Sequence, residues 1–138
     1  MEIKILKIPF DKKIKAHSDG DVLLHSICDA LLGAAALGDI GTHFPDNDDK
    51  YKNISSIKLL KETVLLLKKN DFSIKNIDST IALQEPKLKD FIPEIRKNIA
   101  KACQTKISDI SVKVTTTEKL GYVGEVKGAE SYSIVMIN

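Results

Sequence analysis

The stretch DVLLHSICDALLGAAALG, residues 21–38, decides how the rest of the chain is arranged. It is rich in strong helix formers and places apolar residues on most faces of a helix, so it predicts a largely buried helix. Ser18 and Asp19 precede it as the expected N-terminal caps, and Gly38 and Gly41 are expected to end it. A buried helix needs neighbours on several sides, and the flanking sequence supplies them.

The flanking sequence alternates between strand and helix patterns. Residues 2–8 alternate apolar with charged side chains, as a half-buried strand does. Downstream we expect an acidic loop over residues 38–52, a helix over 55–70, a strand over 72–84, a helix over 90–103, a strand over 109–117, a glycine-punctuated loop over 118–128 and a strand over 129–137. The order β-α-α-β-α-β-β predicts a single domain, residues 1–138, of the α/β (α+β) class. Its predicted architecture is a ferredoxin-like two-layer sandwich with helices on one face of one mixed sheet.

The composition favours a soluble domain without nucleic-acid or membrane partners. A chain of 138 residues can bury roughly two thirds of the surface that its unfolded form exposes. The net charge is +2, and Arg96 is the only arginine, whereas nucleic-acid binders usually gather arginine and aromatic side chains on one face. No apolar run reaches the roughly 18 residues of a membrane span, and the first ten residues lack the apolar core of a signal peptide.

The two cysteines, Cys28 and Cys103, are far apart in the sequence, and Cys28 lies inside the apolar helical pattern. We expect both to be reduced structural residues, because free cysteine is among the most buried residue types. Reduced thiols favour a reducing compartment such as the cytoplasm. A plastid-type organelle is the alternative if a transit peptide has been removed.

The predicted helix over residues 21–38 carries a candidate metal ligand. Asp21, His25 and Asp29 are spaced at i, i+4 and i+8 and share one face. Histidine is an ordinary zinc ligand, and an aspartate could accept a hydrogen bond from the ring nitrogen that does not bind the metal. The alternative is a structurally satisfied histidine with flanking solvated acids.

His17 and Ser18 lie just before this helix, where free backbone N–H groups and the helix dipole favour an anion such as phosphate. The alternative is that Ser18 is only a cap and His17 only a surface residue.

Two loops add polar groups of other kinds. The loop PDNDDK, residues 45–50, is no EF-hand, because it lacks the glycine and glutamate of that motif; it could accept hydrogen bonds from a polyol or be simply solvated. In VTTTEKLGYVG, residues 114–124, hydroxyl and amide groups could hold phosphates, and Glu118 could hold magnesium. Threonines are also common in strands. Taken with His17 and His25, the better joint interpretation is a diphosphate site assisted by metal.

Residues 16–48, AHSDGDVLLHSICDALLGAAALGDIGTHFPDND, and residues 114–124 resemble the signatures of the 2-C-methyl-D-erythritol 2,4-cyclodiphosphate synthase family. The resemblance runs from about Ile8 to the C-terminus. It implies a homotrimeric lyase of non-mevalonate isoprenoid biosynthesis, with active sites between subunits, zinc (or another divalent transition metal), and magnesium or manganese. The implied reaction cyclises 4-diphosphocytidyl-2-C-methyl-D-erythritol 2-phosphate to 2-C-methyl-D-erythritol 2,4-cyclodiphosphate and releases CMP.

The resemblance also implies a role for particular residues. It implies catalytic roles for His17 and Thr116, zinc binding by His25, and binding of magnesium or manganese by Glu118. The implied substrate-binding residues are His17, Ser18, Asp39, Ile40, Gly41, Phe44, Pro45, Asp46, Asn47, Asp48 and Tyr122. The implied nucleotide-binding residues are Leu83, Gln84, Glu85, Pro86, Lys87, Leu88, Thr115, Thr116, Thr117 and Glu118.

The sequence departs from the family pattern in its metal ligands and in two charges. A Gly-x-Asp-x-His element, which supplies two of the family's three protein ligands to zinc, has no counterpart in the 138 residues. Glu125 stands where arginine is usual, and Glu85 where a small residue is usual. The alternative to an active synthase is therefore an N-terminally truncated, catalytically impaired trimer that binds a nucleotide or an isoprenoid phosphate.

Overall fold

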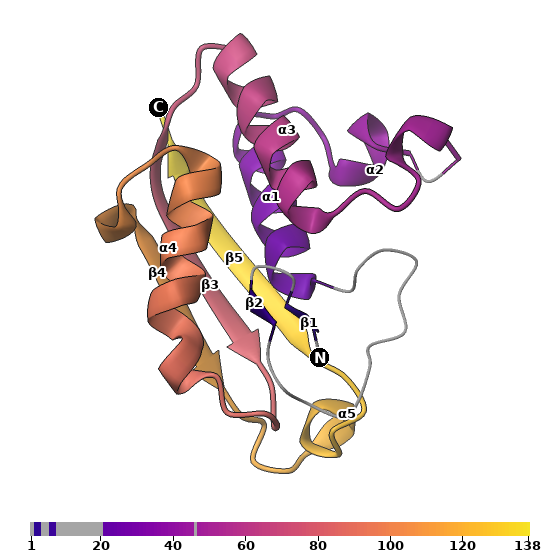
Figure 1. Ribbon diagram of the computed structural model, residues 1–138, viewed down its shortest axis with the longest axis vertical. Coiled ribbons are helices and arrows are strands. Elements are labelled where there is room, and N and C mark those ends of the chain that lie inside the picture. The colour runs from indigo at the N-terminus through magenta and orange to yellow at the C-terminus, as the bar shows by residue number, and fades with distance from the viewer. Residues whose placement is uncertain (1, 4–5, 8–20, 46) are drawn as a thin grey trace.

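The computed structural model describes residues 2–3, 6–7, 21–45 and 47–138 and places a three-stranded mixed sheet at the centre of the chain (Figure 1). Strand β3 (Ile74–Ala82) lies in the middle, parallel to β4 (Ile110–Thr115) and antiparallel to β5 (Glu130–Ile137). A parallel pair needs a long crossover, and the segment between β3 and β4 contains a helix that provides it. The mixed sheet predicted from the sequence is confirmed.

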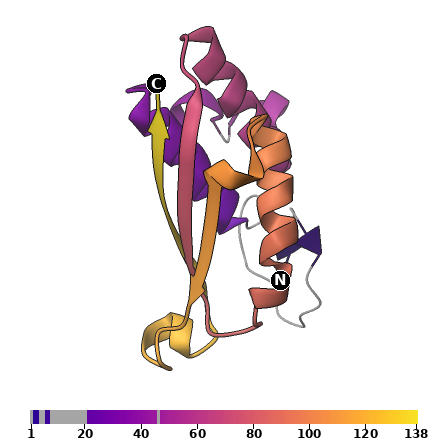
Figure 2. The same ribbon diagram turned by 90° about the vertical axis from the view of Figure 1, so that its left-hand side faces the viewer.

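Three long helices cover one face of this sheet, as Figures 1 and 2 show. They are α1 (Val22–Ala34), α3 (Ser56–Lys69) and α4 (Ile92–Cys103). Helix α1 packs on β5 and α4 packs on β4, while α3 lies against the other two helices. The predicted two-layer α+β arrangement is therefore confirmed.

The core lies between the helices and the sheet. The central strand β3 turns one face toward this core. Ile77, Ser79 and Ile81 are buried, and they alternate with Asp78 and Thr80, which lie on the other face. The largest fully buried side chains of the helices are leucines and isoleucines, namely Leu23, Leu24, Ile27, Leu31, Leu32, Leu60, Leu67, Ile95 and Ile99. Helix α1 supplies more of them than α3 or α4, as its apolar sequence predicts.

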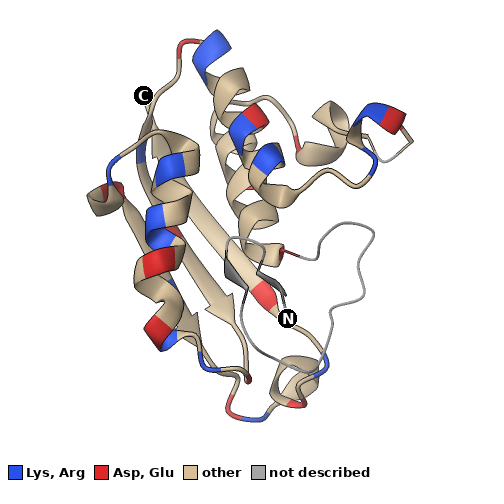
Figure 3. Cartoon of the chain, viewed as in Figure 1, with Lys and Arg blue, Asp and Glu red and all other residues tan. Residues whose placement is uncertain are grey.

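Both cysteines are free and buried, as predicted. Burial raises the pKa of Cys28 and of Cys103 to about 12, so both thiols stay protonated at neutral pH. None of the helices in the described part of the chain has the length and apolar character of a membrane span. In the view of Figure 3, acidic and basic residues are distributed along the helices and the loops.

Several predictions of element boundaries were wrong. The expected single strand over residues 2–8 is instead two short strands, β1 (Glu2–Ile3) and β2 (Leu6–Lys7), which pair with each other in a separate sheet. Period-two alternation is the same in one strand and in the two arms of a hairpin, so it could not separate them. The prediction of one sheet is corrected accordingly.

The ends of α1 also differ from the prediction. Asp21, rather than Ser18 or Asp19, is its N-cap, with Oδ1 accepting a hydrogen bond from the Leu24 N–H. The helix ends at Ala34, four residues before Gly38, because Ala36 takes the left-handed conformation (φ 56°) that was expected of a glycine.

Short helices occupy parts of the predicted loops. They are α2 (Ile40–His43), α5 (Gly121–Gly124) and the 3₁₀ turns η1 (Asp49–Tyr51), η2 (Lys89–Phe91) and η3 (Ile107–Asp109).

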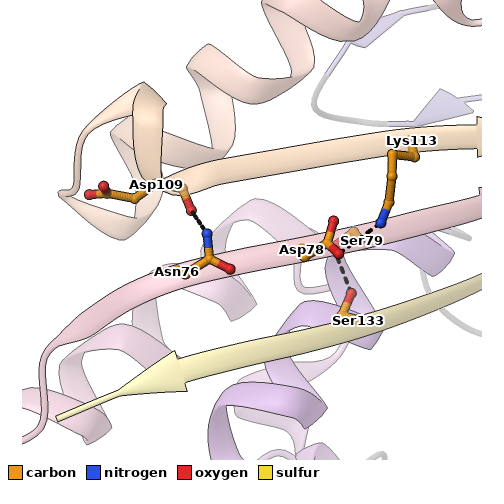
Figure 4. A network of polar contacts seen from close by, with 6 residues as sticks. All are labelled: Asn76, Asp78, Ser79, Asp109, Lys113 and Ser133. Carbon is orange, nitrogen blue, oxygen red and sulfur yellow. Dashed lines mark hydrogen bonds and ion pairs between the residues drawn. The ribbon is translucent and has the colours of Figure 1, made fainter.

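A chain of serine hydroxyls joins α1 to the sheet. Ser26 Oγ donates to the Leu23 carbonyl at 2.9 Å, so the Ser131 and Ser133 hydroxyls, at 2.9 and 2.8 Å, must donate to Ser26. Ser133 has then used its proton, and Ser79 donates to it at 2.8 Å. Figure 4 shows the Ser79 to Ser133 contact between β3 and β5. This network fixes α1, and therefore His25, over the sheet.

We predict that Ser26→Ala destabilises the protein by about 2 kcal/mol, because it leaves two hydroxyl donors at the helix–sheet contact without their acceptor. Denaturant unfolding followed by circular dichroism measures the free energy of unfolding. The exposed Ser108 offers the matched control, for which Ser108→Ala should cost much less. Equal stability of Ser26→Ala and wild type would show that the network does not hold α1.

Candidate active site

Helix α1 presents His25 in a defined tautomer. The His25 Nδ1 lies 2.7 Å from the backbone carbonyl of Asp21, which has no proton to give, so Nδ1–H is the donor. The lone pair is then on Nε2, which is the nitrogen that would meet a metal ion. The half-buried imidazole therefore has the tautomer in which Nε2 can act as a metal ligand.

Helix α2 is attached to α1 through a carboxylate. Asp29 Oδ1 accepts a hydrogen bond from the backbone N–H of Ile40 at 2.9 Å. Asp39 caps α2, with Oδ1 accepting from the Thr42 N–H at 2.8 Å and from the Thr42 hydroxyl at 2.9 Å. The Thr42 N–H, followed by its hydroxyl, lowers the pKa of Asp39. The turn over residues 39–41 is thus held with an ionised carboxylate at neutral pH.

Aromatic contacts order the loop that follows. The Phe44 and Tyr51 rings meet edge to face with centroids 5.3 Å apart, and the Lys50 ammonium lies 5.2 Å from the Tyr51 ring centroid. Asp48 caps the η1 turn by accepting from the Lys50 N–H at 2.9 Å. The acidic loop of the sequence is therefore partly structured by its own side chains, and Asn47 is exposed within it.

The predicted nucleotide loop, residues 83–88, connects the end of β3 to η2. Leu83 and Leu88 bury their side chains in the core, so they can offer a ligand only backbone groups. Glu85 and Lys87 are exposed, and the Glu85–Pro86 peptide bond is cis.

The threonine loop, residues 115–119, follows β4 and lies beside the nucleotide loop. The Leu83 N–H donates to the Thr115 carbonyl at 2.9 Å, and the Lys119 N–H donates to the Gln84 Oε1 at 3.2 Å. The structure therefore brings together the two segments to which the family resemblance gives a role in nucleotide binding.

The threonine loop has an unusual backbone. Glu118 and Lys119 both adopt left-handed conformations, at φ 53° and 64°, which are uncommon for residues other than glycine. The Thr116 hydroxyl donates to the Glu118 carboxylate at 3.1 Å, and the Thr117 hydroxyl donates to the Leu120 carbonyl at 2.7 Å. Strained turns of this kind persist where the surroundings fix them, and they concentrate at functional sites.

Tyr122 and Glu125 follow the threonine loop, and each has a charged partner. Glu130 accepts hydrogen bonds from the hydroxyls of both Tyr122 and Tyr132. These bonds lower the pKa of Glu130, and the bond to Glu130 raises the pKa of each tyrosine. Glu125 forms an ion pair with Lys127.

The described candidate residues form two groups within the chain. Hydrogen bonds join the nucleotide loop to the threonine loop, and the Asp29 carboxylate joins α1, which carries His25, to the beginning of α2. Both views place α2 toward one end of the molecule and α5 toward the other (Figures 1 and 2). A cavity of about 140 Å³ between the ends of α3 and α4 contains none of these residues. His17, Ser18 and Asp46 lie outside the described residues.

The described ranges contain no group of three or more histidine, cysteine, aspartate or glutamate side chains placed to hold a metal ion. His25 has the right tautomer, but a zinc site needs about three protein ligands. The described residues therefore do not fit zinc as a complete site, and no catalytic step is assigned to it.

A family model described as the YgbB family matches residues 2–138, nearly the whole chain. The chain belongs to the YgbB family. A relative from Syntrophobacter fumaroxidans, named 2-C-methyl-D-erythritol 2,4-cyclodiphosphate synthase, is 50% identical over 132 residues, which cover 96% of this chain and 83% of that protein. The family resemblance predicted from the sequence is confirmed.

Solved structures of YgbB relatives share the fold. The bifunctional IspDF of Campylobacter jejuni superposes with a TM-score of 0.90 at 46% identity, covering 96% of this chain and 36% of that longer chain. The IspF of Plasmodium falciparum, in a CDP complex, superposes with a TM-score of 0.79 at 39% identity, covering 89% of this chain and 74% of that chain.

Sequence reasoning missed three contacts between residues of the candidate site. They are the Asp29 contact to Ile40, the Glu130 bridge between two tyrosines, and the close approach of Gly124 to Lys119, where an added Cβ would lie 2.2 Å from the Lys119 carbonyl carbon. The spacing of His25 and Asp29 was visible in the sequence, but the partner of Asp29 was not. Gly121 and Gly124 were visible only as loop residues.

Proposed function

We propose that this YgbB protein cyclises 4-diphosphocytidyl-2-C-methyl-D-erythritol 2-phosphate to 2-C-methyl-D-erythritol 2,4-cyclodiphosphate and releases CMP. The observation that carries the proposal is the paired nucleotide and threonine loops in a chain whose relatives carry that enzyme's name. A relative bound to CDP supports the cytidine-diphosphate part of the substrate. The alternative, an impaired nucleotide-binding trimer, has no such support from the relatives' names.

The reaction needs positioning more than it needs a protein nucleophile. An oxygen of the 2-phosphate attacks the β-phosphorus, a P–O bond closes the ring, and the bond from the β-phosphorus to the bridging oxygen breaks as CMP leaves with the electron pair. Both phosphates are anionic, so donors that neutralise their charge lower the barrier. In this proposal the Thr116 hydroxyl, with His17, donates to the phosphates, and the 83–88 loop holds cytidine.

The remaining roles concern the polyol and the metals. Asp39, with the backbone of Ile40 and Gly41, would hold the erythritol hydroxyl groups, since Asp39 is ionised and exposed. His25 Nε2 is the proposed zinc donor, and the Glu118 carboxylate the proposed donor to magnesium or manganese. Metal cations at such a site would neutralise phosphate charge and align the attack.

The proposed assembly is a homotrimer with each active site shared between subunits. Because α2, which follows Asp39, and α5, which follows the threonine loop, lie toward opposite ends of one chain, we propose that a neighbouring copy completes each site. The face of the sheet opposite the helices is exposed and apolar along β5, where Tyr132, Ile134 and Met136 are 62%, 77% and 64% exposed. A second and third copy packed on that face would bury these side chains. A cytoplasmic location stays a prediction.

The direct test is turnover of the cytidine-diphosphate substrate by the 138-residue protein, with zinc content measured in parallel. We expect CMP and the cyclic diphosphate in equal amounts in the presence of magnesium. Thr116→Ala should lower kcat by about 100-fold, the usual loss for one donor to a developing charge. Thr105→Ala, at the far end of α4, is the control and should retain activity. Binding of CDP without release of CMP would instead favour the binding-module alternative.

A further inference from the structure

We infer that Asp29 is a positioning residue, whose carboxylate fixes the polyol-binding turn over residues 39–41 to the helix that carries His25. The inference rests on the proposed function and deepens it. It concerns how the erythritol unit, which carries the attacking phosphate, is placed relative to the β-phosphorus.

The contact that carries the inference is a hydrogen bond between a side chain of α1 and the backbone of α2. Asp29 follows His25 by four residues on α1, so both side chains leave the same face of the helix. Its Oδ1 lies 2.9 Å from the backbone nitrogen of Ile40, the first residue of α2. A charged acceptor makes a stronger hydrogen bond than a neutral one. The link therefore runs from the imidazole-bearing helix directly to the backbone of the turn.

Helix α2 is held by few contacts, among which the half-buried side chain of Ile40 packs against the core. It has four residues, and none of them is buried. So short a helix has little stability of its own, because nucleation is unfavourable. Asp39 caps it from within, and the ring of His43 contacts the Leu37 carbonyl at 2.7 Å, which fixes the end of α2 to the preceding turn. Of these contacts, the one made by Asp29 ties the beginning of α2 to the body of α1.

The placement matters because the substrate attacks itself. The attacking phosphate is carried on the erythritol unit, so a shift of the turn over residues 39–41 moves the nucleophile relative to the β-phosphorus. Displacements of about 1 Å from the reactive geometry can cost about 100-fold in rate. The nucleotide half lies on different loops and would be unaffected. Loss of Asp29 should therefore lower kcat and leave nucleotide affinity unchanged.

A structural role for Asp29 can be separated from a role as metal ligand. An asparagine keeps an oxygen that can accept from the Ile40 N–H but is a much poorer ligand for a cation than a carboxylate. The positioning role thus predicts that Asp29→Asn retains most activity while Asp29→Ala does not. The metal-ligand role predicts that both variants lose metal and activity alike.

The experiment measures amide hydrogen exchange at Ile40, kcat, CDP affinity and zinc content in Asp29→Ala, Asp29→Asn and wild type. We expect Asp29→Ala to exchange the Ile40 amide at least about tenfold faster and to lose about 10- to 100-fold in kcat, with CDP affinity and zinc content unchanged. Asp29→Asn should restore both the exchange rate and kcat to within about threefold of wild type. Glu94→Ala removes an exposed carboxylate from α4 and should match wild type throughout.

Two results would overturn the inference. One is unchanged exchange at Ile40 in Asp29→Ala, and the other is equal loss of zinc and activity in both Asp29 variants. A wild-type protein without turnover would overturn the proposed function instead, because the exchange rate of Ile40 would still decide whether Asp29 holds the turn.

Discussion

Replacing Ile134 with aspartate is expected to convert the proposed trimer into folded monomers and to abolish turnover. Ile134 lies in the middle of β5 on the face of the sheet opposite the helices, which we call the open face. It is the most exposed of the large apolar side chains of β5. Burying an isoleucine contributes about 1.5–3 kcal/mol, and three copies would meet in one assembly. An aspartate in the same place would have to be buried without a partner, which costs several kcal/mol more.

Loss of activity follows from the division of the site between two halves. A monomer would keep both groups of residues, but in the proposed trimer each active site combines one group from each of two subunits. CDP binding should therefore weaken less than turnover does. Light scattering after gel filtration measures the mass, circular dichroism checks the fold, and CMP release measures activity.

The matched control is an exposed apolar side chain on the other layer. Leu65 of α3 is 46% exposed, and Leu65→Asp should leave both mass and turnover unchanged. The prediction would be contradicted if Ile134→Asp stayed trimeric, or if it became monomeric and remained fully active. The first result would move the interface to another face, and the second would place a complete site within one chain.

Polar contacts on the open face bear on how copies would be oriented. Lys113 of β4 forms an ion pair with Asp78 of β3 at 2.7 Å, and Asn76 donates to the Asp109 carbonyl at 3.2 Å (Figure 4). The Lys113 ammonium, followed by the Ser111 hydroxyl, lowers the pKa of Asp78. On this face the side chains of β3 and β4 are thus polar, and those of β5 are apolar. An assembly in which β5 lies at the centre of the subunit interface would bury the apolar side chains and leave the polar ones nearer to solvent.

The long elements could be predicted from the sequence because each carries a repeating signal. Helix α3 shows this most clearly, since Ser55 caps it by accepting from the Lys58 N–H, and it ends on the lysines that suit its C-terminal dipole. Strand β3 alternates apolar with polar side chains, and Pro86 follows it and marks its end. These local patterns agree with the tertiary structure, so the predicted order of the long helices and strands from residue 21 onward was right.

The site was harder to predict because its contacts are neither periodic nor local. The carboxylate of Asp29 finds its partner eleven residues later, in a helix too short to leave a pattern. Glu118 and Lys119 adopt left-handed conformations without being glycine, and nothing in their own chemistry favours this. The family resemblance supplied the site residues, while the sequence alone could not supply the geometry that holds them.

Gly124→Ala is expected to disrupt the threonine loop and to lower kcat by about 100-fold or more. Gly124 is the last residue of α5, and an added Cβ would lie 2.2 Å from the carbonyl carbon and 2.6 Å from the Cα of Lys119. These are backbone atoms, so no rotamer change can relieve the overlap, and α5 and the 118–119 turn must move apart. The turn would then lose the geometry that holds Glu118 against Thr116.

The substitution should affect binding as well as rate, because the Lys119 N–H that reaches Gln84 belongs to the displaced turn. We therefore expect weaker CDP binding, measured by calorimetry, together with the loss of kcat. This pattern differs from the one expected of Asp29→Ala, which should leave CDP affinity unchanged. The two variants thus test the two halves of the site separately.

Gly33→Ala provides the control for adding one methyl group at a glycine. Gly33 lies near the end of α1, and beyond the adjacent residues and the backbone of its own helix no atom lies within 4 Å of the position of its Cβ. Alanine is favoured over glycine within a helix by up to about 1 kcal/mol, so Gly33→Ala should raise the melting temperature and leave turnover unchanged. Wild-type activity in Gly124→Ala would mean that the 118–119 turn can move without loss of function. The left-handed conformations of Glu118 and Lys119 would then be a consequence of packing against α5 rather than a requirement of the reaction.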